Sequence, residues 1–194
     1  MSTLLNIRGT NGSGKSTVVR DLMLRQGIVS SIKNEKGKTW AYELGEKIFV
    51  LGRYETACGG LDTYKDFAQT RTAIRSLLPL GHIVMEGVLW STVFKQSDEV
   101  AREFPQHHCI WAMLDTPAEI CLRRVKARQE EKGKVKDIDE ALLIDKIEQI
   151  TRRQAALKDE GWDTRILPWT NPFPVVCEWL TNEGVLMPRE EMGE

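Results

Sequence analysis

The chain has 194 residues, of which 41% are hydrophobic, and a formal net charge of −1. This length is typical of one domain with its own core, and the charge argues against a protein that grips nucleic acid by bulk electrostatics, although not against a local basic cleft. No run approaches the roughly 20 apolar residues of a membrane span, and the N-terminus lacks a secretory signal. The cysteines form no C-x-x-C pair, which favours free thiols in a reducing cytoplasm.

A phosphate-binding P-loop is predicted near the N-terminus, where residues 9–16 read GTNGSGKS and match G-x-x-x-x-G-K-[ST]. An apolar strand precedes it, and a helix over 17–25 follows, with Gly27 placed to end that helix. Lys15 would reach the β- and γ-phosphates, and Ser16 would offer its hydroxyl to Mg²⁺. The expected nucleotide-binding residues are Gly9, Thr10, Asn11, Gly12, Ser13, Gly14, Lys15, Ser16 and Thr17.

Strand-like segments alternate with helical ones along the chain, which predicts a single domain over 1–194. The expected fold is a three-layer α/β P-loop NTPase fold with a five-stranded, mainly parallel sheet. Residues 39–44, with Gly45 as the turn, would add an antiparallel β-hairpin to it. The five expected strands are 4–8, 47–51, 82–86, 108–114 and 164–167.

The glycine-rich segment 52–62 follows the second of these strands, at the sheet edge where ligands bind in α/β folds. An acceptor hydroxyl needs a carboxylate within hydrogen-bond reach to take its proton. Asp62 is the first choice for this base, and Glu55 is the second. The alternative role of Asp62 is to cap a helix that begins at Thr63.

A substrate segment is expected over about 52–78. Arg71 falls on the apolar stripe of the helix in this segment, where it needs a partner, either a substrate phosphate or an acid on a neighbouring element. Arg53 and Tyr54 would join it in contacting a nucleic acid backbone and stacking on a base. The expected substrate residues are Arg53, Tyr54, Gly59, Gly60 and Arg71.

Glu86 ends an apolar strand, where a P-loop enzyme needs an acid to hold Mg²⁺ or its water shell. Ser16 and Glu86 are therefore the metal candidates, unless Glu86 faces solvent. Asp115 also ends an apolar strand, but residues 116–119 read as a capping box, which explains an acid at the head of that helix. Trp169, after the last strand, would border the adenine or belong to the core.

Arg124 and Arg128 lie one turn apart and flank the apolar stripe of the helix that follows Pro117. Two guanidinium groups there would clamp the charge on a transferring phosphoryl group, or else pair with acids such as Glu131. The charged run that follows is either a solvated connection or a mobile lid, expected over about 124–140. The catalytic residues are then Lys15, Asp62, Arg124 and Arg128.

Together these residues resemble the P-loop kinase group that includes nucleoside, nucleoside-monophosphate and polynucleotide kinases. The resemblance covers the P-loop (9–17), the acid-tipped strand (82–87) and the segment 114–128. It implies a five-stranded parallel sheet, a substrate segment after the second strand, ATP and Mg²⁺ held by Lys15 and Ser16, and lid arginines at 124 and 128.

The loop 52–62 looks, more narrowly, like that of virus-encoded kinases that act on 5-hydroxymethyluracil in DNA. Those enzymes phosphorylate the hydroxymethyl group of the base, which activates it for hypermodification of thymine. This resemblance implies an ATP-dependent phosphotransferase with an alcohol acceptor, DNA containing 5-hydroxymethyluracil as the partner and, if the chain is viral, a location in the host-cell cytoplasm.

Other classes of nucleotide-binding protein fit less well. A GTPase would need an N-K-x-D guanine motif, which the chain lacks, and an ABC or AAA-type ATPase would need more length and its own signatures. Two alternatives stay open, a kinase of a free nucleoside or nucleotide and a non-catalytic nucleotide-binding protein. The oligomeric state and the choice of base among Asp62, Glu55 and Glu86 also stay open.

Overall fold

The computed structural model describes residues 1–56, 59–133 and 138–187, and within them seven strands form one sheet. The strands are β1 (Thr3–Arg8), β2 (Ile28–Lys33), β3 (Thr39–Leu44), β4 (Ile48–Leu51), β5 (His82–Glu86), β6 (His108–Leu114) and β7 (Asp163–Leu167). Their order across the sheet is β2-β3-β4-β5-β1-β6-β7. The helices are α1 (Lys15–Gln26), α2 (Phe67–Leu77), α3 (Val88–Thr92), α4 (Phe94–Glu103), α5 (Ala118–Glu131), α6 (Glu140–Asp159) and α7 (Pro172–Asn182).

The sheet is mostly parallel, as predicted, but it has seven strands in the described residues instead of five. The predicted five form its parallel part, because β4, β5, β1, β6 and β7 pair in parallel with one another. The predicted hairpin strand is β3, which is antiparallel to β4. Strand β2, at the edge of the sheet, was not predicted, because none of its residues is buried and no buried apolar pattern marks it.

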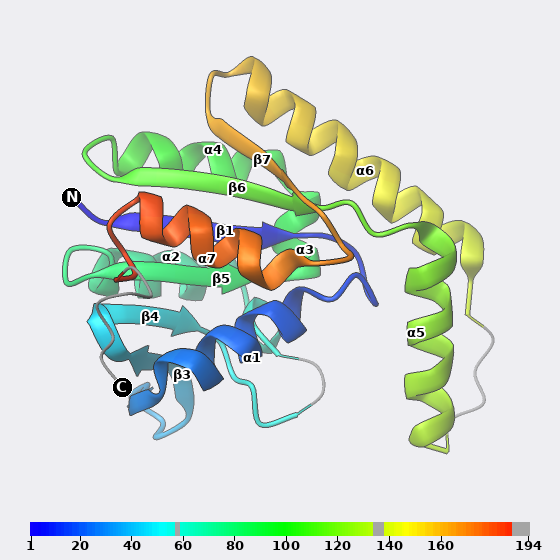
Figure 1. Cartoon of the computed structure of the whole chain (residues 1–194), viewed down its shortest axis with the longest axis horizontal. Helices are drawn as coiled ribbons and strands as arrows, with labels where there is room; N and C mark the ends of the chain where they lie inside the picture. The colour runs from blue at the N-terminus through cyan, green and yellow to red at the C-terminus, as the bar shows by residue number, and fades with distance from the viewer. Residues whose placement is uncertain (57–58, 134–137, 188–194) are drawn as a thin grey trace.

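Helices cover both faces of the sheet and make the three layers (Figure 1). Side chains of β1 alternate between two cores, as the period of a strand requires. Leu5 packs with Leu22 of α1 and residues of α7 on one face. Leu4 packs with Ile74 of α2 and Val100 of α4 on the other. The predicted P-loop therefore directly follows β1, a strand that is buried on both faces.

Helix α5 stands beside the edge of the sheet toward which β1 runs, and α6 returns from it toward β7 (Figure 1). These two helices share a small core of Cys121, Val125 and Leu143. The predicted lid segment, about 124–140, covers the second half of α5 and the connection to the start of α6, of which residues 134–137 lie outside the described part. The lid role itself stays a prediction. No helix in the described ranges is both long and apolar enough to span a bilayer.

Candidate active site

The P-loop connects β1 to the N-terminus of α1, which begins at Lys15. No side chain of the described residues caps this N-terminus, so its N–H groups are available to an anion. Gly12 has a φ of +79°, and a Cβ placed on it would lie 2.4 Å from the carbonyl oxygen of Cys121. Glycine is needed there because α5 packs directly against the loop. At its other end, α1 closes on Gly27 as predicted.

A pocket of about 490 Å³ opens at the start of α1 and brings together segments that are distant in the sequence. It is lined by residues 11–18 of the P-loop and first turn of α1, by Gly59, Asp62, Glu86, Arg124 and Arg128, and by residues 169–173 after β7. All four residues expected to be catalytic and both metal candidates lie on this pocket.

A buried ion pair and the hydroxyl of Ser16 meet in this pocket. Ser16 donates a hydrogen bond of 2.7 Å to Oε1 of Glu86, whose Oε2 lies 4.0 Å from Nζ of Lys15. Lys15 also donates to the carbonyl oxygen of Thr10 at 2.9 Å. Burial lowers the pKa of Lys15, and the charge of Glu86 offsets part of that shift. Burial raises the pKa of Glu86, while Lys15 and the Ser16 hydroxyl oppose the rise.

Asp62 caps a helix, but not the one that the sequence predicted. Its two carboxylate oxygens accept hydrogen bonds from the backbone N–H groups of Val88, at 3.1 Å, and Leu89, at 3.3 Å, at the start of α3. No α-helix begins at Thr63, where the chain forms a short 3-10 turn over Leu61–Thr63, and α2 is capped by Asp66 instead. The local pattern was misleading because the capped helix lies 26 residues further along the chain.

The Gly59–Gly60 pair allows the close backbone approach that the sequence indicated. The backbone of Gly60 packs directly against Glu86. A Cβ on Gly60 would lie 2.5 Å from Oε1 of Glu86 and 2.4 Å from its carbonyl oxygen. A Cβ on Gly59 would lie 2.7 Å from the ring of Tyr54. The loop therefore packs against the end of β5 and holds Asp62 beside Glu86.

Arg124 connects α5 to the P-loop. Its Nη1 donates to the carbonyl oxygens of Gly12, at 3.2 Å, and Ser13, at 3.1 Å. The capping box expected at 116–119 is wrong, because no side chain caps α5 and the hydroxyl of Thr116 donates to Ser13 at 2.8 Å. The P-loop carbonyls are thus held from outside by α5, and Arg128 lines the same pocket one turn further on.

Trp169 lines the pocket next to α5, and Asp115, which does not line it, holds the Trp169 backbone. Oδ1 of Asp115 accepts a hydrogen bond of 2.8 Å from the backbone N–H of Trp169. The Trp169 ring lies under the guanidinium of Arg124, 5.7 Å from its centroid, and is partly exposed to the pocket. Trp169 also packs against the core on this face of the sheet, so the structure gives it both positions, and a role beside a bound base stays a prediction.

The structure does not bring Tyr54 or Glu55 into the pocket. Tyr54 is buried in the core beneath Arg20, whose guanidinium lies 5.7 Å from the ring centroid, and burial raises its pKa well above the usual value. Its ring is therefore not a free stacking surface for a base. Glu55, the second choice of base, accepts a hydrogen bond of 2.8 Å from the hydroxyl of Tyr42 and does not line the pocket.

Arg71 has the acidic partners that the sequence analysis offered as the alternative to a substrate phosphate. Its guanidinium pairs with Glu99 and, at 3.0 Å, with Glu103, both on α4. It does not line the pocket. Arg53 lies on the other side of α2 and lines a separate groove together with Thr63.

Sequence reasoning missed Arg8, which is fully buried at the end of β1 just before the P-loop. Its guanidinium donates to the hydroxyl of Ser97, at 2.9 Å, and the carbonyl of Ser91, at 2.6 Å, and burial lowers its pKa to about 9. The hydroxyl of Ser91 in turn accepts from the N–H of Gly9 at 3.3 Å. A charged residue at the end of a buried strand is the signal that would have found this support of the P-loop.

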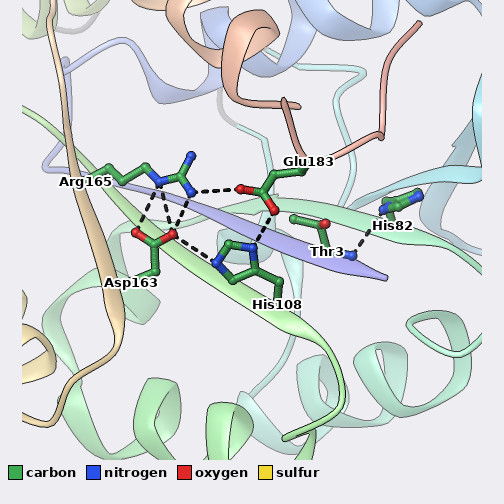
Figure 2. A network of polar contacts seen from close by, with 6 residues as sticks. All are labelled: Thr3, His82, His108, Asp163, Arg165 and Glu183. Carbon is green, nitrogen blue, oxygen red and sulfur yellow. Dashed lines mark hydrogen bonds and ion pairs between the residues drawn. The ribbon is translucent and has the colours of Figure 1, made fainter. Parts of the chain in front are cut away.

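A second cluster of ionisable groups lies at the amino ends of β6 and β7, on the side of the sheet away from the P-loop (Figure 2). His108 and Asp163 begin β6 and β7, whereas Glu86 ends β5, so this cluster is remote from the P-loop. Its donor atoms are the one set in the described residues that meets a metal-ligand spacing. However, Arg165 binds both acids, Asp163 at 2.6 Å and Glu183 at 2.9 Å. With a guanidinium already in place, the cluster is an ion-pair network.

Comparison with known proteins places the chain in a family. A family model described as 5-hmdU DNA kinase matches residues 1–161. The 5-hmdU DNA kinase of Delftia phage PhiW-14 is 41% identical over 143 residues, which are 64% of this chain and 54% of the relative. The chain thus spans about half the length of that relative. The 5-hmdU DNA kinase of Pseudomonas phage M6 is 32% identical and is covered over 98% of its length, with 93% of this chain.

The solved structure of deoxyadenosine kinase from M. mycoides with bound dATP also aligns with the chain. It covers 94% of this chain and 98% of its own, with 12% identity and a TM-score of 0.44, which is too distant a likeness to carry an argument. The family assignment depends on the sequence matches alone. By the family model, which covers residues 1–161, the chain belongs to the 5-hmdU DNA kinase family.

Proposed function

We propose that the chain is an ATP-dependent kinase that transfers the γ-phosphate to the hydroxymethyl group of 5-hydroxymethyluracil in DNA. The observation that carries this proposal is the meeting of Lys15, Asp62 and Glu86 at one pocket. A phosphate site and two carboxylates converge there, as transfer to a hydroxyl requires. The family relationship supports the acceptor, because the family model and the relatives carry the name 5-hmdU DNA kinase.

The residues present fit ATP and Mg²⁺. The uncapped N-terminus of α1 and the buried ammonium group of Lys15 suit the negative charge of phosphates. Oxygen ligands are what Mg²⁺ prefers, and the Ser16 hydroxyl and Glu86 carboxylate are already together. These two residues would hold the ion, directly or through water. When bound, Mg²⁺ would neutralise charge on the phosphates.

The proposed reaction is an in-line displacement. The acceptor oxygen attacks the γ-phosphorus, a new P–O bond forms, and the bond from the γ-phosphorus to the bridging oxygen of ADP breaks. Asp62 takes the proton of the acceptor hydroxyl. Lys15, Arg124 and Arg128 stabilise the charge on the phosphoryl group, so positioning and electrostatics provide most of the acceleration.

Labelled ATP distinguishes this acceptor from the alternatives. The protein is incubated with Mg²⁺ and a duplex that contains 5-hydroxymethyluracil, beside the same duplex with thymine and beside free nucleosides and nucleotides. We expect label only in the first duplex. Label in a free nucleoside or nucleotide alone would favour a kinase of small substrates. ATP binding without transfer to any alcohol would favour a non-catalytic nucleotide-binding protein.

A further inference from the structure

A second groove, of about 760 Å³, lies between the β2–β3 hairpin and α2, outside the nucleotide pocket. We call it the hairpin groove and define it by Lys33, Lys36, Lys38, Arg53, Tyr64 and Lys65. It is on the active-site edge of the sheet, because Ala41, near the start of β3, pairs with Leu51, the last residue of β4. The hairpin turn at 34–38 therefore extends beyond the carboxyl ends of the parallel strands.

The hairpin groove concentrates positive charge on a chain whose formal net charge is only −1. Five cations line it, Lys33, Lys36, Lys38, Arg53 and Lys65, against the two carboxylates of Glu35 and Asp66. In the parts of the chain that the structure describes, none of these five cations forms an ion pair. Asp66 is further occupied by capping α2, where it accepts from the N–H of Gln69 at 2.9 Å.

Ion pairs do form on the neighbouring helix α2. Arg71 and Arg75, on the same helix α2, both pair with Glu103 of α4. The chain thus neutralises the two cations of α2 with its own acids, whereas the five cations of the hairpin groove form no ion pair in the described residues. Unpaired, solvent-facing cations in a groove attract a ligand with several negative charges.

The hairpin groove is continuous with the catalytic loop. The hydroxyl of Thr63 accepts from the N–H of Arg53, at 3.1 Å, and donates to the carbonyl oxygen of Gly60, at 2.7 Å. Gly60 in turn packs against Glu86. A small cavity of about 110 Å³, lined by Asp62 and by Tyr64 and Lys65, lies between the nucleotide pocket and the groove. A polymer bound in the groove would therefore pass beside Asp62.

We propose that the hairpin groove binds the phosphodiester backbone of DNA beside the nucleotide that is phosphorylated. This inference rests on the proposed function, and it names the surface that would hold the polymer. Exposed lysine side chains on a turn suit phosphates, which recur along a strand without regard to base sequence. The groove would then explain how a nearly neutral chain engages a polyanion, through a local concentration of charge next to the catalytic carboxylate.

The test compares two double variants that remove equal charge. Lys36→Gln/Lys65→Gln removes two cations of the hairpin groove, and Lys146→Gln/Lys158→Gln removes two from α6. Binding of a fluorescent duplex containing 5-hydroxymethyluracil is measured by anisotropy between 50 and 200 mM salt. We expect the groove variant to bind at least about tenfold more weakly and to lose about 2 from the slope of log K against log salt. The α6 variant should match the unaltered protein within about twofold.

Equal weakening by both double variants, or no weakening by either, would overturn the inference. Phosphorylation measured at saturating DNA separates this result from the proposed function. If the groove variant binds like the α6 variant while both phosphorylate the duplex, the inference fails and the proposed function stands. If the unaltered protein phosphorylates no alcohol but the groove variant alone loses DNA affinity, the proposed function fails, and only the assignment of the groove as a DNA-binding surface stands.

Discussion

The hydroxyl of Ser16 donates a hydrogen bond of 2.7 Å to Oε1 of Glu86, which joins the start of α1 to the end of β5. The pairing places a P-loop hydroxyl on a carboxylate that is nearly inaccessible to solvent. Burial makes the charge of Glu86 costly, and the nearby ammonium of Lys15 offsets part of this cost. A cation bound by Glu86 would offset more of this cost, so the buried carboxylate fits a role in binding Mg²⁺.

Glu86→Gln should therefore weaken the affinity for Mg²⁺. The amide keeps the shape and one acceptor but removes the negative charge, so we expect the Mg²⁺ concentration for half-maximal phosphate transfer to rise about 10- to 100-fold. Magnesium titrations of transfer to the duplex measure it. Glu178→Gln, an exposed acid on α7, is the control and should leave the titration unchanged. An unchanged titration in Glu86→Gln would remove Glu86 from the metal site.

Lys15→Met should abolish productive ATP use while preserving the fold. The methionine side chain is long and apolar, so it fills the same buried space but cannot bind phosphate. We expect a fall in transfer rate of about 10²- to 10³-fold. Transfer rates and ATP affinity by calorimetry are measured together with thermal unfolding. Lys158→Met, on the exposed end of α6, serves as the matched control. Normal ATP affinity in Lys15→Met would contradict the assignment.

Asp62 has two roles to separate, because it caps α3 and is the proposed base. Asp62→Asn retains an acceptor for the cap, so its free energy of unfolding should change little, whereas Asp62→Ala should lose about 1 kcal/mol. If Asp62 takes the proton, both variants should lose transfer activity, by about 10²-fold or more. Urea unfolding and initial rates give the two quantities. Full activity in a stable Asp62→Asn would leave Asp62 with the capping role alone.

The sequence predicted what depends on local pattern and missed what depends on distant partners. The P-loop and the parallel strands were recognisable because a spaced motif and apolar runs define them. Strand β2 was not, since it is an exposed edge strand without an apolar period. The role of Asp62 also escaped, because the N–H groups it caps belong to residues 88 and 89.

Two polar residues show the same limit for side chains. Thr116 fits a capping box by spacing, but its hydroxyl binds Ser13, 103 residues earlier in the chain. Arg71 was expected to need a partner, and two acids on α4 fulfil that need. The packing of the helices decides which of several acids or carbonyls a side chain contacts. A few neighbouring residues in the sequence do not reveal that packing.

Gly60→Ala should damage the site more than a positive φ alone explains. Gly60 has a φ of +70°, and an added Cβ would lie 2.5 Å from Oε1 of Glu86. Gly184 has a similar φ of +68° but open space around it, so Gly184→Ala is the control for a positive φ without a close contact and should cost about 1 kcal/mol. We expect Gly60→Ala to lose about 2–3 kcal/mol and most of its transfer activity. Equal losses in unfolding free energy would show that the packing on Glu86 is unimportant.

The network at the far edge of the sheet should make stability depend on pH (Figure 2). Burial, the largest single effect, would raise the pKa of Asp163, but the hydrogen bonds and charges of Arg165 and His108 together outweigh it and hold the pKa below its usual value. Burial would likewise raise the pKa of Glu183, but its contacts with Arg165 and His108 lower the pKa below its usual value. Carboxylates with lowered pKa values stabilise the fold above their unfolded pKa values, about 4, and lose this contribution as pH falls through the folded values.

Arg165→Gln should therefore destabilise the protein at pH 7 and matter less in acid. Removing a guanidinium that binds two partly buried carboxylates should cost about 1–3 kcal/mol at neutral pH. The difference from the unaltered protein should shrink as the pH falls below about 4, where both carboxylates become protonated. Urea unfolding between pH 3 and 7 measures it. Arg152→Gln removes an exposed pair with Glu148 and should change stability by less than about 0.5 kcal/mol throughout. A difference that stays constant with pH would mean that Arg165 acts through packing on Trp179, whose ring centroid is 5.3 Å away, and not through charge.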